Sequence, residues 1–162
     1  GSGILNLAKK IASTLKEFSE KFNVIIKLHP KENNSTSIIY KKISKGKIKI
    51  TRKDTKKLIK ISDVILTCFS TIALEAIIAE KPLILINLDF AFPDYSEFDK
   101  GCSALRAHSE EELKDYIDKC LYDKAIQKKL AKGRKLTLKN NYYKLHGRSN
   151  EAVFKEINKF IN

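Results

Sequence analysis

The pattern of apolar and polar positions predicts alternating helices and strands from the first residues onward. Residues 4–22 place apolar side chains three and four positions apart, which is typical of an amphipathic helix. Residues 24–28 are a short β-branched run, and they predict a strand that ends before Pro30, since proline cannot continue a ladder. Residues 47–51 alternate in polarity and predict a second strand near the edge of a sheet.

Two helices are expected around that second strand. The polar run at 31–37 predicts a surface loop, and residues 38–43 predict a short helix that is closed by the Lys45-Gly46 turn. Asp54 is a good N-cap and predicts a helix over 55–62.

The stretch from Ile61 to Leu88 predicts a complete βαβ unit. Residues 63–69 and 83–88 form two continuous apolar runs, and a hydrophobic helix over 72–80 lies between them. Continuous rather than alternating apolar strands are expected when helices cover both faces of a parallel sheet. The polar pair Ser70-Thr71 falls at the turn before the helix, where free backbone N–H groups favour an anion.

The remainder of the chain is expected to be rich in helices. Residues 89–101 contain aromatic, acidic and turn-forming side chains and predict an irregular loop. Ser109 and Glu112 form a capping box that opens a helix. The other expected elements are a brief strand at 104–107, a helix at 123–131, an ambiguous segment at 132–147 and a last helix beginning at Ser149.

This order of elements predicts an α/β fold, namely an open, doubly wound parallel sheet with a helix-rich C-terminus. Residues 4–162 are interpreted as a single Rossmann-like nucleotide-binding domain, and Gly1–Gly3 as an expression scar. A doubly wound unit normally starts with a strand, whereas this chain starts with a helix. We therefore expect it to be a fragment of a larger enzyme.

Composition is that of a globular protein in a reducing compartment. The 162 residues include 43% hydrophobic and 31% charged side chains, and no apolar run approaches the ~20 residues of a membrane span. Cys68, Cys102 and Cys120 are odd in number and widely spaced, so neither a disulfide framework nor a zinc site is expected. A cytoplasmic location follows.

The net charge of +13 has several interpretations. Nucleic acid, an anionic membrane surface and an anionic small molecule would each suit it. Lysines that are merely solvated along most helices are an equally good explanation. Arginine-rich clusters interleaved with aromatic residues are missing, which weighs against nucleic acid.

Polar residues follow each predicted strand at its carboxyl end, where parallel sheets bind their ligands. Candidate groups occur at 27–30, at 51–52, at 70–71, at Asn87 and at Asp89. All of them would converge on one edge of the sheet. The sequence lacks GxGxxG, P-loop and serine-elbow motifs, so it predicts neither dinucleotide binding nor those hydrolase mechanisms.

The individual residues have both functional and structural interpretations. His29 could bind a diphosphate oxygen or transfer a proton, or it could simply bond neighbouring backbone. Ser70 and Thr71 could donate to phosphate or only cap the helix. Glu75 could accept from ribose hydroxyls or pair with a lysine. Arg52 and Lys27 could neutralise a diphosphate, whereas His108 and His146 lie in polar, surface-like contexts.

Two motifs, KLHPKE at 27–32 and SDVILTCFSTIALEAIIAEKPLILIN at 62–87, resemble the C-terminal half of GT-B-type glycosyltransferases. They look most like capsule and polysialic-acid transferases and the CDP-glycerol glycerophosphotransferases of teichoic acid synthesis. Those enzymes carry an HP dipeptide after one strand and an S-S/T pair before a helix with an acidic residue. The resemblance implies that His29, Ser70 and Thr71 contact donor phosphates and that Glu75 contacts the ribose.

The resemblance also implies a donor-nucleotide domain, for a nucleotide-sugar or CDP-polyol, within a two-domain transferase of cell-surface polymer synthesis. His29 is then the candidate catalytic residue, and neither a metal nor a further cofactor is required. The acceptor-binding N-terminal domain would be missing, so the chain alone is expected to bind a nucleotide diphosphate without turnover. The alternatives are a UDP-GlcNAc 2-epimerase-like domain and a non-enzymatic basic module. Contact with the inner face of an anionic membrane is also compatible with the charge.

Overall fold

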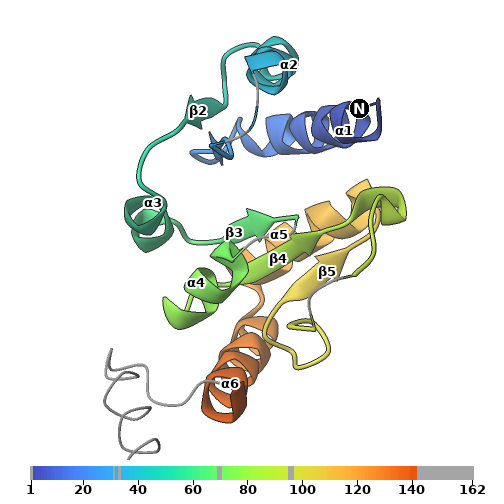
Figure 1. Cartoon of the computed structure of the whole chain (residues 1–162). Coiled ribbons are helices and arrows are strands. Elements are labelled where there is room, and N and C mark those ends of the chain that lie inside the picture. Colours follow the sequence, from blue (N-terminus) through green and yellow to red (C-terminus); the bar gives the residue numbers. More distant parts are fainter. Residues whose placement is uncertain (1, 31, 33, 69–70, 95–96, 142–162) are drawn as a thin grey trace, which may run out of the picture.

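Helices and strands alternate along the part of the chain that the computed structural model describes, residues 2–30, 32, 34–68, 71–94 and 97–141. The first elements are α1 (Ser2–Phe18), β1 (Ile25–Lys27), α2 (Asn34–Ser44), β2 (Lys49–Thr51), α3 (Thr55–Ile61) and β3 (Ile65–Thr67). They are followed by α4 (Ile72–Ile78), β4 (Leu83–Ile86), the 3-10 turn η1 (Leu88–Phe90), β5 (Leu105–Ala107), α5 (Glu110–Tyr122) and α6 (Lys124–Asn141) (Figure 1).

In the described part of the chain the strands pair only in parallel, which confirms the α/β class. Within the described residues they form two hydrogen-bonded groups, β1-β2 and β3-β4-β5, rather than one continuous ladder. In the pair, Ile26 lies opposite Ile50. In the three-stranded sheet, Leu85 of β4 lies between Thr67 and Arg106. The βαβ unit expected around residues 61–88 is therefore present as β3-α4-β4.

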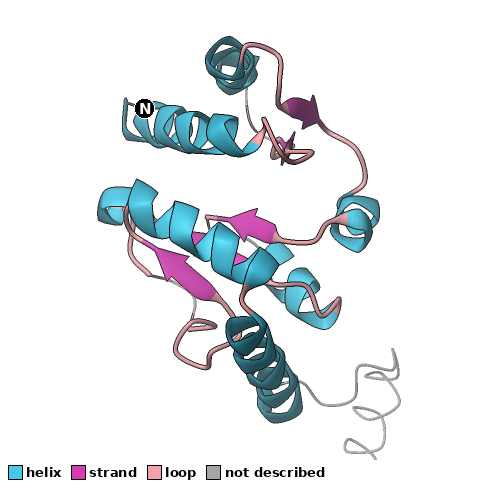
Figure 2. Cartoon of the chain, turned by 180° about the vertical axis from the view of Figure 1, so that it is seen from behind, coloured by secondary structure: helices cyan, strands magenta, loops and turns pink. Residues whose placement is uncertain are grey.

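The three-stranded sheet is covered by helices on both faces (Figure 2). All four residues of β4 are buried, and they alternate between two cores. Leu83 and Leu85 pack with residues of α3 and α4, whereas Ile84 and Ile86 pack with residues of α1 and α5. A strand buried on both faces must be apolar throughout, and this explains the continuous LILI run.

Helix α1 joins the two-stranded and three-stranded groups. Its apolar stripe contributes Ile11 and Leu15 to the core that holds β4 and α5, whereas Ala8 and Ala12 pack with β1 and α2. Polar contacts with α5 reinforce the junction: Thr14 Oγ1 donates to Glu110 Oε2 at 3.0 Å, and Lys114 pairs with Glu17 at 2.8 Å.

Two segments differ from their sequence-based predictions. Helix α2 begins at Asn34, so residues 34–37 are helical and not part of the loop expected there. Thr36 and Tyr40 are buried on its inner face, and this packing outweighs the weak helix propensity of Asn, Ser and Thr. The helix at 123–131 likewise extends to Asn141 as α6.

Helix α6 continues through Gly133 because this glycine is a packing position. A Cβ at Gly133 would lie 2.1 Å from the carbonyl oxygen of Cys102, so only glycine permits the close approach. Asp123 Oδ1 caps the helix by accepting from the N–H groups of Ala125 and Ile126, at 2.8 and 3.1 Å. The last helix, expected from Ser149, lies outside the described residues.

Among the described helices, none combines the length and the apolar character that crossing a membrane would need.

Candidate functional site

His29 lies in a tight loop between β1 and α2 that is closed by hydrogen bonds. Its backbone N–H donates to Glu32 Oε2 at 2.9 Å, and the N–H of Glu32 donates back to the carbonyl oxygen of His29 at 2.9 Å. The preceding Leu28 is buried, whereas His29 is exposed. The sequence did not single out Glu32, although it belongs to the same KLHPKE motif. This carboxylate fixes the loop at the carboxyl end of β1.

Arg52 also holds this loop. Its Nη1 and Nη2 atoms donate to the carbonyl oxygens of His29 and Glu32, at 3.1 and 2.9 Å. The structure thus brings two predicted site residues, His29 and Arg52, into direct contact. Both acceptors are neutral carbonyls, so these bonds position the guanidinium without cancelling its charge. A phosphate near His29 would still experience that positive charge.

The other predicted site residues lie on neighbouring elements. Lys27 is half-buried in β1, and its Nζ lies 3.5 Å from the carbonyl oxygen of Leu28, which is a long contact. Thr71 is the exposed N-cap of α4, and its side chain makes no cap hydrogen bond. Glu75 is half-buried in the first turn of α4. Ser70 lies outside the described residues.

The loop after β1 lies close to the carboxyl end of β3. Burial raises the pKa of the Cys68 thiol to about 11, and the negative charge of Glu32 adds to the rise. Burial likewise raises the pKa of Tyr40, with further contributions from Glu32 and Cys68. Glu32 thus influences the acidity of both Cys68 and Tyr40. The hydrogen bonds of Arg52 show that the carboxyl ends of β1 and β2 meet, whereas β3 belongs to the other hydrogen-bonded group of strands.

A polar network that the sequence did not reveal organises the segment after β4. Asn87 is fully buried, and its Nδ2 atom donates to the carbonyl oxygen of Phe92 and to Asp94 Oδ1, at 2.8 and 2.7 Å. The Arg106 side chain is 6% exposed; it binds Asp94 at 3.0 Å and both oxygens of Asp99, at 3.0 and 2.9 Å.

This network changes the acidity of its members. Burial alone would raise the pKa of Asp99, but the hydrogen bonds and the positive charge of Arg106 outweigh it, so the pKa falls below its usual value. The hydrogen bond that Arg106 donates to Asp99 outweighs burial and raises the pKa of Arg106 in turn. An ion pair stabilised in this way holds Asp94 and Asp99 against β5, although neither of them lies in a helix or strand.

His108 lies beside this network at the end of β5 and not on the open surface that the sequence suggests. Its side chain is 25% exposed, and its Nδ1 atom lies 3.2 Å from the carbonyl oxygen of Asn87. The imidazole stacks on Phe90, with ring centroids 4.0 Å apart. Phe90 and Asp89 both have positive φ angles, 51° and 55°, which is rare for residues with side chains. His146 lies outside the described residues.

The sequence indicated only part of the polar network around Asn87 and Arg106. Asn87 and Asp89 stood out because they follow an apolar strand, but Asp94, Asp99 and Arg106 are separated from it by an irregular segment. Only the tertiary fold brings these side chains together. The described residues contain no group of three or more His, Cys, Asp or Glu side chains arranged to hold a metal ion.

The fold and these strand-end clusters define an α/β protein whose candidate site lies at the carboxyl edge of parallel strands. The model of one protein family, CDP-glycerol:poly(glycerophosphate) glycerophosphotransferase, matches residues 4–159. The chain therefore belongs to this family of transferases. Comparisons with curated proteins and with solved structures find no match.

Proposed function

We propose that this chain binds a nucleotide-diphosphate donor of the CDP-glycerol class at the carboxyl ends of β1, β2 and β3. The family match over residues 4–159 carries the proposal. The arrangement of His29 supports it, because the imidazole is presented by a loop that Arg52 and Glu32 hold in place. The positive charge of Arg52 suits a diphosphate at this edge.

In glycerophosphate transfer, an acceptor hydroxyl oxygen bonds to the glycerol-bearing phosphorus of the donor and loses its proton, the bond between the two phosphates breaks, and CMP leaves. Negative charge therefore grows on the leaving phosphate, and preorganised donors at that position lower the barrier. In this proposal His29 donates a hydrogen bond or a proton to the leaving phosphate, and Arg52 and Lys27 add positive charge. Ser70 and Thr71 contact the phosphates, and Glu75 accepts from the ribose hydroxyls. These roles require no metal ion.

The wider context of the proposal is a two-domain, GT-B-type transferase that works in the cytoplasm on a teichoic-acid-like polymer. The acceptor would then bind to a domain other than residues 4–162, so this chain binds donor without turnover. Membership in a transferase family favours this function over a sugar epimerase. A nucleotide-sugar of capsule synthesis is the alternative donor within the same site.

The test is a titration of the ¹⁵N-labelled chain with CDP-glycerol, CDP, CMP, UDP and GDP, followed by amide chemical shifts. We expect cytidine diphosphates to shift resonances at 28–32 and 51–53 and to bind more tightly than UDP and GDP. Charge-assisted hydrogen bonds contribute about 1.5–3 kcal/mol, so His29→Ala should weaken binding about tenfold or more. Lys128→Ala, on an exposed part of α6, is the control and should bind like the wild type.

Two results would overturn the proposal. One is the failure of every nucleotide to shift any resonance, and the other is equal affinity in the wild type and His29→Ala. Tighter binding of UDP than of CDP would keep the site but replace the CDP-glycerol donor by a nucleotide-sugar.

A further inference from the structure

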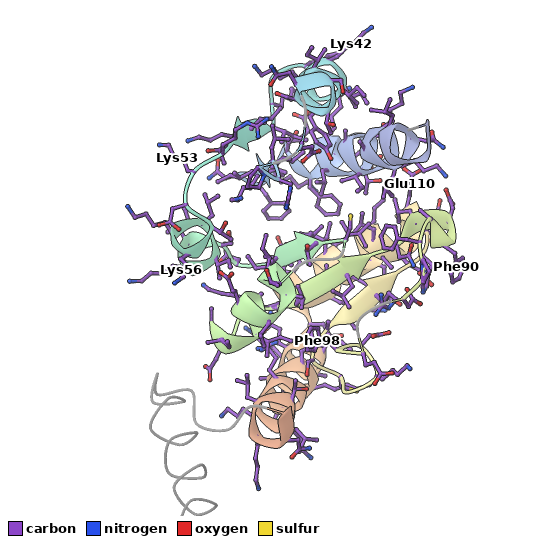
Figure 3. All side chains as sticks on the ribbon, viewed as in Figure 1. Lys42, Lys53, Lys56, Phe90, Phe98 and Glu110 are labelled. Carbon is purple, nitrogen blue, oxygen red and sulfur yellow. The ribbon has the colours of Figure 1, made fainter. Side chains whose placement is uncertain are left out.

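The 3-10 turn η1, which follows β4, exposes an aromatic ring at the carboxyl edge of the three-stranded sheet. Phe90 is 70% exposed, and it projects outward at the end of the molecule where α5 begins at Glu110 (Figure 3). A single exposed apolar residue is common on protein surfaces and by itself indicates no function. Phe90 differs from such residues in its backbone conformation, its packing and its position.

The backbone holds Phe90 in a conformation that costs energy. Asp89 and Phe90 have φ angles of 55° and 51°, so two successive residues with side chains occupy the left-handed region that favours glycine. The N–H of Asp89 donates to the carbonyl oxygen of His108 at 2.8 Å, and Asp89 forms an ion pair with Lys10. The N–H of Phe90 donates to the carbonyl oxygen of Asn87 at 3.1 Å. Backbone strain that the surrounding structure maintains in this way is concentrated at ligand-binding sites.

One face of the Phe90 ring is covered and the other is open. The imidazole of His108 stacks on the ring, with the centroids 4.0 Å apart and an angle of 15° between the planes. The imidazole is held in turn, because its Nδ1 atom lies 3.2 Å from the carbonyl oxygen of Asn87. Since one face is stacked and the residue is still 70% exposed, the opposite face is turned to solvent. A flat and rigidly held aromatic ring with one open face is a surface on which nucleobases stack.

The turn lies next to part of the site proposed for the diphosphate. Strand β4 pairs with β3, with Leu85 opposite Thr67, so the residues after β4 lie beside those that lead from β3 to Thr71. Neighbouring strands are about 5 Å apart. This spacing is shorter than the distance between the base and the phosphates of an extended nucleotide, so one ligand can reach both strand ends.

We propose that the open face of Phe90 is the platform on which the base of the nucleotide donor stacks. The inference rests on the proposed donor function and assigns the base to the turn after β4. The amide of the buried Asn87 does not read the base, because it is occupied by the backbone of Phe92 and by Asp94. Stacking tolerates every base, so Phe90 adds affinity without choosing between cytosine and uracil.

The test compares the affinities of CDP, UDP and inorganic pyrophosphate for the wild-type chain and Phe90→Leu, measured from amide chemical shifts. Leucine keeps an apolar side chain and the same strained φ angle but has no flat ring. We expect Phe90→Leu to weaken CDP and UDP about tenfold each, because a stacked base contributes at least that factor, and to leave pyrophosphate unchanged. Phe90→Trp keeps a flat ring and should bind CDP at least as tightly as the wild type.

The matched control is Tyr122→Leu. Tyr122 is 65% exposed at the last residue of α5, so this change also replaces an exposed aromatic ring, but at the far end of a 13-residue helix that begins near η1. This variant should bind all three ligands like the wild type. Circular dichroism checks the fold of each variant. If Phe90→Leu is unfolded, Phe90→Asn replaces it, because asparagine tolerates a positive φ angle.

The outcomes separate the base platform from the donor site itself. If Phe90→Leu binds CDP like the wild type while His29→Ala weakens it, the donor site stands and the base platform is wrong. Equal losses of CDP and pyrophosphate in Phe90→Leu, or equal losses of CDP in Phe90→Leu and Tyr122→Leu, would also overturn the platform. If neither nucleotides nor pyrophosphate bind the wild type, the donor function is wrong and the platform is excluded with it.

Discussion

The two groups of strands are held by different means. In the three-stranded sheet, β4 is buried along its whole length and faces one hydrophobic core on each side. In the β1-β2 pair, the side chains of both strands are half-buried or exposed. The carboxyl end of β1 is instead held by Arg52 and Glu32, which bond the His29 loop directly. Hydrophobic burial stabilises the three-stranded sheet, whereas polar contacts hold the candidate donor-binding loop after β1.

The residues that stabilise the fold and the residues that shape the candidate binding loop therefore lie in different parts of the molecule. Exposed hydrogen bonds contribute little to global stability but can fix one local geometry. The His29 loop therefore belongs to the part of the molecule that opens easily, whereas β4 belongs to its most stable part. Three comparisons between matched residues test this division.

The largest effect is expected in β4. Leu85 is 1% exposed between helices on one face of the sheet, so Leu85→Ala removes buried methyl groups and leaves a cavity. The free energy of unfolding should fall by about 4 kcal/mol. Ile25→Ala in the half-buried β1 should cost about 1 kcal/mol. Urea denaturation followed by circular dichroism measures both, and equal costs would contradict the division between the two groups of strands.

The two strand-end arginines give the second comparison. Arg106→Ala breaks a pair in which the arginine is buried but Asp94 and Asp99 are 41% and 27% exposed, so it should cost about 2 kcal/mol. Arg52→Ala removes two exposed hydrogen bonds to carbonyls and should cost about 1 kcal/mol. Amide hydrogen exchange should nevertheless become faster at residues 29–32 in the Arg52 variant. If Arg52→Ala lowers the free energy of unfolding more than Arg106→Ala does, the His29 loop belongs to the stable part of the fold.

The same network predicts a pH dependence. The pKa of Asp99 is lower in the folded protein than in the unfolded chain, so its ionised form stabilises the fold. This stabilisation is present above the unfolded pKa of an aspartate, about 3.9, and is lost as the pH falls through the lower folded value. Asp99→Asn should therefore be less stable than the wild type at pH 7, with a difference that shrinks toward pH 2. A constant difference would exclude Asp99 as the titrating group.

The smallest changes in stability are expected at the N-caps of two helices, α5 and α4. Ser109 accepts a hydrogen bond from the N–H of Glu112 at 3.1 Å, so Ser109→Ala should cost about 1 kcal/mol. Thr71 makes no cap hydrogen bond, and Thr71→Ala should cost no more than about 0.5 kcal/mol. If Thr71 binds phosphate, the same change should weaken nucleotide binding severalfold. If Thr71→Ala lowers the free energy of unfolding as much as Ser109→Ala does, the role of Thr71 is to cap the helix.

Much of the fold could be predicted because its signals are local. The β3-α4-β4 unit follows from two continuous apolar runs that flank a helical stretch, and α1 follows from its apolar periodicity. Asp54 and Ser109 were both expected as N-caps, and both accept the hydrogen bonds that define a cap. In each case the residues that determine the structure lie within one turn or strand of one another.

The rest depended on contacts between distant residues. The first turn of α2 is stabilised by packing of Thr36 and Tyr40, and α6 continues through Gly133 because the carbonyl oxygen of Cys102 approaches it. Arg52 was predicted to help neutralise a diphosphate, and the tertiary structure adds that it also donates hydrogen bonds to the His29 loop. The pairing of Arg106 with Asp94 and Asp99 spans an irregular segment that has no periodicity to interpret.

The sequence by itself therefore determined the α/β class, the order of most elements and the strand ends at which candidate residues occur. Periodicity, caps and apolar runs encode these features within short stretches of chain. Only the tertiary structure decided which candidates meet, that Glu32 and Arg52 fix the His29 loop, and that Phe90 stacks on His108 after β4. Those outcomes depend on how helices pack against strands, because such packing joins residues that the sequence keeps far apart.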